Sequence, residues 1–140
     1  MGKERATTLI ERNADDVWAT VRDFGDLSWF PHVESCTRDG DLRRIRMEGK
    51  TIDVVERVLS HDDEGRTYTY RLAEPLDLDS LGRPDLPPTL ERLEATLTIE
   101  PNDASTSRVL YDVDADQAVV RSTRDGYQRA IDHLKAQLER

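Results

Sequence analysis

The chain has 140 residues, of which 35% are charged, and its 29 Asp and Glu outnumber 20 Lys and Arg for a formal net charge of −9. This length is enough for one domain with its own hydrophobic core, so we expect residues 1–140 to form a single domain. The acidic balance argues against nucleic acid as a partner, because a phosphate backbone is bound through clustered Lys and Arg.

The N-terminal part of the chain indicates a strand followed by two short helices. Residues 5–11 contain consecutive Thr, Leu and Ile residues, which favour a strand. Asn13 then offers a helix N-cap, with acidic residues in the first turn, where the helix dipole favours them. This helix should run to about residue 23. A second short turn of helix is expected over 26–30, ended by Pro31.

Beyond Pro31 the apolar residues change from helical spacing to alternation, which is typical of strands. Turn sequences rich in Asp, Gly, Asn and Pro separate most of these segments, so successive strands should pair antiparallel. The expected strands are 32–37, 42–47, 51–60, 66–73, 91–100 and 106–114.

The C-terminal segment from about residue 116 predicts one long amphipathic helix. Its apolar residues recur at helical spacing and are Val120, Tyr127, Ile131, Leu134 and Leu138. The expected fold class is therefore α+β: a curved seven-stranded antiparallel sheet wrapped around a long C-terminal helix, with two short helices after the first strand.

Residues 74–90 interrupt this pattern with four prolines, which exclude a central strand. A loop of this length inside a compact domain usually has a function or is disordered. The loop also carries spaced leucines, among them Leu76, Leu78, Leu81 and Leu86. We interpret it as the lid of a cavity; a plain surface excursion and a contact in a homodimer are the alternatives.

Alternation also assigns the face of the sheet that looks inward. This face is apolar except for three tyrosines, Tyr68, Tyr70 and Tyr111, and one carboxylate, Glu56. A plain core would favour Leu, Ile and Val, because a buried tyrosine hydroxyl needs a hydrogen-bond partner. Together the tyrosines suggest polar contacts around a ligand or ordered water, although each one alone also fits a core position with its hydroxyl at the rim.

In order and spacing, these segments resemble the START/Bet v 1-like (SRPBCC) superfamily, in its polyketide cyclase/dehydrase and lipid-transport branch. The segments that carry the resemblance are 14–18, 23–27, 29–31, 55–59, 61–63, 68–72, 93–101 and the C-terminal helix. The resemblance implies a helix-grip fold, with a large cavity between the sheet and the long helix. It also implies a ligand that is a lipid, sterol, hormone or polyketide.

In plant hormone receptors of this superfamily, a strand glutamate lines the cavity and contacts the ligand through water. Glu56 matches that position, with Val58 in place of the receptors' leucine. The receptors' gate loop would fall at 48–51, but without their proline, and their latch near Asp77. These departures leave a hormone-receptor function unsupported and keep the geometry of a covered pocket.

Glu56 is the most informative single residue, because a carboxylate on an apolar face costs several kcal/mol unless it is paired, hydrated or protonated. Three interpretations remain open. Glu56 forms a structural ion pair, for example with Arg124 or Arg46; it anchors a ligand; or it acts as a general base or acid with a raised pKa.

The three histidines and the single cysteine, Cys36, have no metal-ligand spacing, and no phosphate-binding glycine motif occurs. We therefore expect neither a metal site nor a cofactor. Residues 1–5 are not followed by the apolar stretch of a secretory signal, and no run approaches the roughly 20 apolar residues of a membrane helix. The expected location is cytoplasmic, without membrane insertion.

The leading hypothesis is binding or transport of a small hydrophobic ligand, such as a lipid, sterol or polyketide-like molecule, in an internal cavity of one START/Bet v 1-like domain. Glu56 and the three tyrosines are the expected polar contacts. The expected wall and opening residues are Val54, Leu72, Leu93, Leu97, Tyr127, Ile131, Trp29 and Phe30.

Two other functions stay open. One is a polyketide aromatase/cyclase or dehydratase with Glu56 as candidate base and a tyrosine as oxyanion donor. The other is a protein-interaction module that binds no ligand and has a filled interior. The sequence does not decide whether the protein is an enzyme. It also leaves the oligomeric state open, and a homodimer is one of the possibilities.

Overall fold

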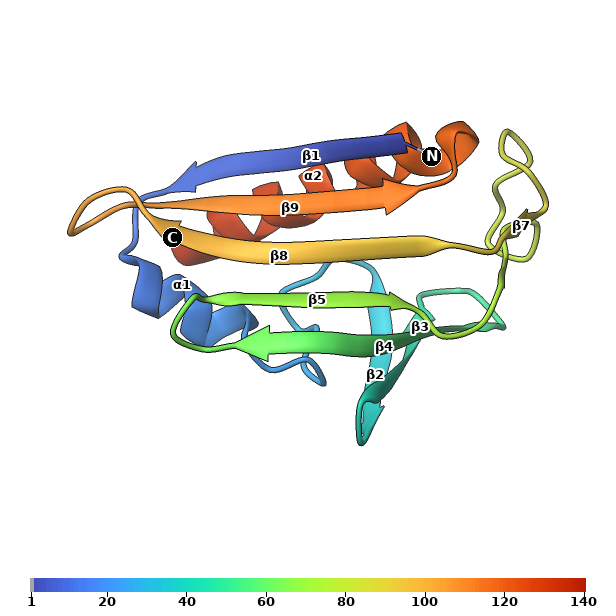
Figure 1. Cartoon of the computed structure of the whole chain (residues 1–140), viewed down its shortest axis with the longest axis horizontal. Helices are drawn as coiled ribbons and strands as arrows, with labels where there is room; N and C mark the ends of the chain where they lie inside the picture. Colours follow the sequence, from blue (N-terminus) through green and yellow to red (C-terminus); the bar gives the residue numbers. More distant parts are fainter. Residues whose placement is uncertain (1) are drawn as a thin grey trace.

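One antiparallel sheet of seven strands dominates the computed structural model, which describes residues 2–140 (Figure 1). Its strands lie in the order β1-β9-β8-β5-β4-β3-β2. Their bounds are β1 Gly2–Ile10, β2 Val33–Asp39, β3 Leu42–Met47, β4 Asp53–Asp62, β5 Thr67–Leu72, β8 Leu93–Pro101 and β9 Ser107–Ala115. The predicted α+β class and the number of strands in the sheet are confirmed.

The helix α1 (Ala14–Val21) begins where the sequence predicts. The side chain of Asn13 accepts a hydrogen bond from the backbone N–H of Asp16 at 2.9 Å, which satisfies one of the free N–H groups of the first turn. Its buried face, with Val17 and Val21 fully buried, packs at one end of the sheet.

The second short helix expected over 26–30 is wrong, because this segment forms only separate hydrogen-bonded turns. The side chain of Asp23 accepts from the N–H of Gly25 at 2.9 Å, and that of Asp26 accepts from Ser28 at 2.9 Å. Such local bonds from aspartate compete with the helical pattern of backbone hydrogen bonds.

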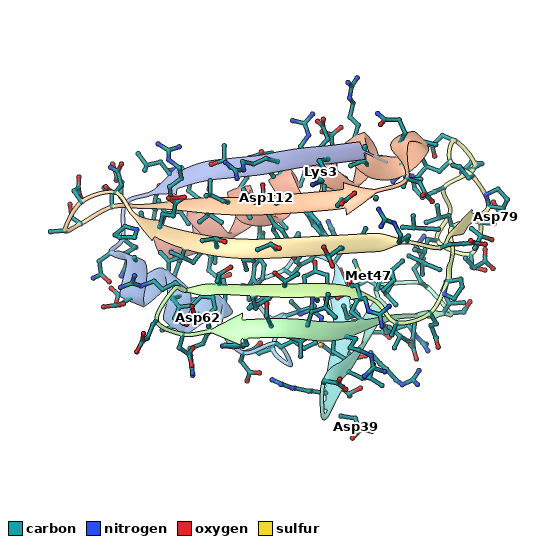
Figure 2. The ribbon with its side chains drawn as sticks, in the orientation of Figure 1. Lys3, Asp39, Met47, Asp62, Asp79 and Asp112 are labelled. Atoms are coloured by element: carbon teal, nitrogen blue, oxygen red, sulfur yellow. The ribbon has the colours of Figure 1, made fainter. Side chains whose placement is uncertain are left out.

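The long helix α2 (Gln117–Leu138) packs across β1 and β9 on one face of the sheet (Figure 1). Its predicted apolar stripe is confirmed: Val120, Tyr127, Ile131 and Leu134 are buried. Each fully buried aliphatic side chain of this kind contributes about 1.5–3 kcal/mol. The opposite face of the sheet carries charged side chains, among them Lys3 and Asp112 (Figure 2), and it therefore faces water.

A β-bulge in β4 breaks the strict alternation of that strand. The pairing of β4 with β5 shifts between Val58 and Ser60, so that His61 lies opposite Tyr68. The two rings are 6.0 Å apart between centroids. Because a bulge bends its strand and increases the twist, it contributes to the curvature of the sheet.

Asp63, at the turn after β4, ties this turn to α1. Its carboxylate accepts hydrogen bonds from the Trp18 indole at 3.0 Å and from Arg22 at 3.0 and 3.1 Å, and His61 lies 3.1 Å away. Hydrogen bonds from these partners hold the pKa of the Asp63 carboxyl well below its ordinary value, and the bond from Arg22 contributes most.

A carboxyl group whose pKa is lowered by folding stabilises the fold above its unfolded pKa of about 3.9, and this contribution disappears as the pH falls through the folded pKa. We therefore expect Asp63→Asn to flatten the loss of stability below pH ~4. Urea unfolding at a series of pH values would measure this. The control is Glu64→Gln, which removes the same charge beside it; an equal flattening in both variants would contradict the assignment.

Within residues 2–140, no helix is both long enough and apolar enough to cross a membrane. The loop between β5 and β8 contains a separate two-stranded sheet, β6 (Leu76–Asp77) and β7 (Thr89–Leu90). In Figure 1 this loop lies at the end of the sheet opposite α1, and Figure 2 shows Asp79 at its outer edge. The proline-rich segment thus stays outside the main sheet, as its composition predicts.

Candidate functional site

A cavity of about 350 Å³ lies between the inner face of the sheet, α2 and the loop that holds β6 and β7. All four leucines of the loop on which the lid interpretation depends are on its wall. The apolar residues of the wall are Leu27, Phe30, Pro31, Val33, Ile45, Met47, Val54, Leu72, Leu76, Leu78, Leu81, Leu86, Leu90, Leu93 and Val119. The wall is therefore mostly apolar, with polar side chains at a minority of its positions.

One polar feature of the cavity is a buried ion pair between Arg43 of β3 and Glu56 of β4. The two residues are direct partners across the strand pair, and their side chains are only 2% and 8% exposed. Arg43 Nε and Nη2 lie 2.8 and 2.7 Å from Glu56 Oε1. Arg43 Nη1 also donates to the carbonyl of Phe24 at 3.0 Å, and the guanidinium carbon lies 3.9 Å from the centroid of the Phe24 ring. The buried charges are thus paired and hydrogen-bonded.

Burial raises the pKa of the Glu56 carboxyl above its ordinary value, and the charge and hydrogen bonds of Arg43 oppose this shift. Burial, the largest single cause, lowers the pKa of the Arg43 guanidinium, but the Glu56 carboxylate together with the nearby tyrosines outweighs burial and raises that pKa. Arg43 therefore stays charged across the whole accessible pH range.

The expected partners of Glu56 were wrong. Arg46 instead pairs with Asp53 at 2.8 Å, and Arg124 lies 3.0 Å from Asp125. The sequence of β3 does contain a signal for the true partner. Arg43 lies two and four residues before Ile45 and Met47, so alternation places it on the same inward face as these apolar residues.

A second polar feature links three tyrosines from two strands and α2. The Tyr70 hydroxyl lies 2.5 Å from that of Tyr111 and donates to that of Tyr127 at 2.8 Å. The rings of Tyr111 and Tyr127 stack, with centroids 3.9 Å apart and planes 7° from parallel. Burial raises the pKa of all three phenols, so they remain neutral hydrogen-bonding groups.

The structure divides the predicted site residues into two groups. On the cavity wall lie Glu56, Tyr70, Val54, Leu72, Leu93, Tyr127 and Phe30. Buried outside the wall lie Tyr68, Tyr111, Leu97, Ile131 and Trp29. Alternation predicts the face but not the position along the strand, and the cavity occupies the part of the sheet near the β6–β7 loop.

The part of the inner face near α1 is filled instead by aromatic side chains. Tyr68 packs against Trp18 and Phe24, with ring centroids 6.0 and 5.9 Å apart. Its buried hydroxyl has no hydrogen-bond partner among residues 2–140. Trp29 is fully buried, beside Phe30. These residues belong to the packed core.

The family model for polyketide cyclase / dehydrase and lipid transport matches residues 1–139. The chain belongs to this family. The resemblance predicted from the sequence is thereby confirmed.

Solved structures share the fold of this family member. Protein XoxI from Bacillus cereus superposes with a TM-score of 0.81 at 19% identity, covering 100% of this chain and 99% of that one. The di-domain ARO/CYC BexL of the BE-7585A biosynthetic pathway gives 0.77 at 17% identity, covering 99% of this chain and 47% of that one. A START superfamily protein from Mycobacterium smegmatis gives 0.64 at 15% identity, covering 98% and 94%. By sequence, no curated protein matches the chain.

Two wall residues that sequence reasoning missed join the β6–β7 loop to α2. Arg83 of the loop donates to the Ser122 hydroxyl at 2.8 Å and pairs with Asp85 at 2.9 Å. Nothing in the local sequence around Arg83 predicts this contact, because it spans 39 positions of the chain.

No three His, Cys, Asp or Glu side chains gather into a possible metal site within the described 2–140 range.

Proposed function

We propose that this family member binds one small, largely apolar molecule in the cavity between its sheet and α2. The observation that carries the proposal is the cavity itself. Its volume of about 350 Å³ falls within the range of roughly 300–1,000 Å³ typical of small-molecule sites. Removal of ligand surface from water drives such binding, and a few fixed polar groups set its orientation.

Glu56 and the tyrosine hydroxyls supply these polar groups. Both Arg43 nitrogens that contact Glu56 use Oε1, and Oε2 accepts no hydrogen bond from any other part of the described chain. An ionised carboxylate has about four lone-pair sites, so Oε2 can accept from a ligand hydroxyl. Tyr70 and Tyr127 add hydroxyls on the same wall.

A polyketide cyclase or dehydratase activity is the second candidate. It is supported by the position of Glu56, a carboxyl of raised pKa on the wall beside Tyr70, and by the fold shared with the ARO/CYC BexL. In that role Glu56 would remove a proton next to a carbonyl, and a phenol would donate to the developing oxyanion. Glu56→Gln should then abolish turnover of a poly-β-keto substrate while the substrate still binds. The third hypothesis, an interaction module with a filled interior, does not fit a cavity of this size.

Gly126→Leu tests ligand binding directly. Gly126 lines the cavity, and a Cβ built on it would meet only Arg129 Nη2, at 3.7 Å, so a leucine side chain can enter the space without displacing backbone. We expect the variant to weaken binding of the neutral fluorescent probe N-phenyl-1-naphthylamine at least about tenfold, which corresponds to 1.4 kcal/mol. Fluorescence titration measures the dissociation constant.

The matched control is Ala136→Leu, which adds the same side chain to an exposed position of α2. It should bind the probe as the wild type does. Equal affinity in all three proteins would show that the probe binds elsewhere, and it would contradict the proposed cavity function.

A further inference from the structure

The charge on the cavity wall is opposite in sign to that of the whole protein. Three arginines, Arg43, Arg83 and Arg129, and one carboxylate, Glu56, line the cavity of a chain whose net charge is −9. We propose that the ligand is an amphiphile with one anionic group, which Arg83 and Arg129 bind at the rim while the apolar body enters the cavity. This inference rests on the proposed function and names the class of ligand.

The positive charge is concentrated at the rim. Arg43 is buried and paired with Glu56, so this buried part of the cavity wall is neutral as a whole. Arg83 and Arg129 are partly or largely exposed. Arg83 is paired with Asp85 on the loop, whereas Arg129 makes no ion pair or hydrogen bond with another residue of the described 2–140 range. One rim cation therefore lacks a counter-charge.

Arg129 is also held at the cavity by the geometry of α2. Ser122, Gly126 and Arg129 are four and three residues apart and share one face of the helix, which is the face on the cavity wall. The Arg129 Nη2 atom lies 3.7 Å from the position of a Cβ on Gly126, so the guanidinium folds back along this face. An anion at the rim can thus meet both Arg129 and the Ser122 hydroxyl to which Arg83 already donates.

Gly126 is otherwise unfavourable, because glycine inside a helix is destabilising relative to alanine. No backbone packs against its open side, so close packing does not require it. What the missing side chain provides is space on the wall between Ser122 and Arg129. Guanidinium groups bind carboxylate and other oxyanions through paired, charge-assisted hydrogen bonds, which suits an anionic head placed there.

Two probes with the same rings separate charge from apolar binding. The probe 8-anilino-1-naphthalenesulfonate carries a sulfonate that N-phenyl-1-naphthylamine lacks. We expect the wild type to bind the anionic probe about tenfold more tightly at low ionic strength, despite the negative charge of the protein, with the difference shrinking as salt screens it. Arg129→Gln should remove most of this tenfold difference and change the affinity for the neutral probe less than about twofold.

The matched control is Arg121→Gln, which removes the same charge from an exposed position of α2 outside the cavity wall. It should leave the preference for the anionic probe intact; Arg83→Gln is a second rim variant that should reduce it. Equal affinity of the two probes for the wild type, or equal effects of Arg129→Gln and Arg121→Gln, would overturn the proposal that the ligand is anionic. Neither result would contradict the proposal that the cavity binds a small apolar molecule. Absence of binding for both probes would overturn both proposals.

Discussion

Arg43→Met should lower the free energy of unfolding by about 3–5 kcal/mol, because it leaves the buried Glu56 carboxylate without its partner. The carboxylate would lose two contacts of 2.7 and 2.8 Å, and the carbonyl of Phe24 would lose its donor. Urea unfolding followed by tryptophan fluorescence, extrapolated linearly to water, measures the change.

Arg46→Met is the matched control, because Arg46 lies on the same strand and also pairs with a carboxylate, that of Asp53, but at a side-chain exposure of 35%. A pair this exposed contributes about 0–1 kcal/mol. The double variant Arg43→Met/Glu56→Leu should recover most of the lost stability, since apolar residues often replace a buried ion pair without loss. If Arg43→Met and Arg46→Met lower the free energy of unfolding equally, the buried pair contributes no more to stability than the exposed one, and the prediction is wrong.

Tyr70→Phe should cost about 1–3 kcal/mol, since it removes the hydroxyl that joins those of Tyr111 and Tyr127 and leaves buried polar groups with fewer partners. Its hydrogen bonds to these two hydroxyls measure 2.5 and 2.8 Å. The same variant removes a polar group from the cavity wall, so it should also weaken binding of a ligand that carries a hydroxyl or carbonyl. Urea unfolding and titration of such a ligand test the two effects separately.

Tyr68→Phe makes the same chemical change in the same strand at a hydroxyl that has no hydrogen-bond partner in the described chain. It should therefore leave stability unchanged within about 0.5 kcal/mol or raise it, because no hydrogen bond is lost. If Tyr68→Phe lowers stability as much as Tyr70→Phe does, the hydrogen bonds of Tyr70 to the other two hydroxyls are not what stabilises the fold there.

Most elements of the fold could be predicted from local patterns in the sequence. The N-cap at Asn13, the alternation in the strands and the helical stripe of α2 each predict one element, and successive strands pair antiparallel wherever a short turn joins them. The turns at 26–30 were mispredicted, because aspartate side chains there take the backbone N–H groups that a helix would use.

The site was predicted less completely, because its composition depends on contacts between distant positions. Glu56 was identified from its carboxylate on an apolar face, but its partner depends on the register between β3 and β4, which local sequence does not specify. Likewise, Tyr68 and Tyr70 share a face, yet only Tyr70 reaches the cavity. Arg83 enters the wall from an irregular loop that no periodicity describes.

A crystal structure of the chain grown with N-phenyl-1-naphthylamine tests most directly whether the space under the β6–β7 loop holds a guest. If the cavity binds the probe, electron density for its rings will lie between Leu72 and Leu93 of the sheet and Val119 of α2, three residues of the cavity wall. Density for the probe on the outer face of the sheet alone, with the leucines of the loop packed directly onto Tyr70 and Leu72, would contradict this prediction.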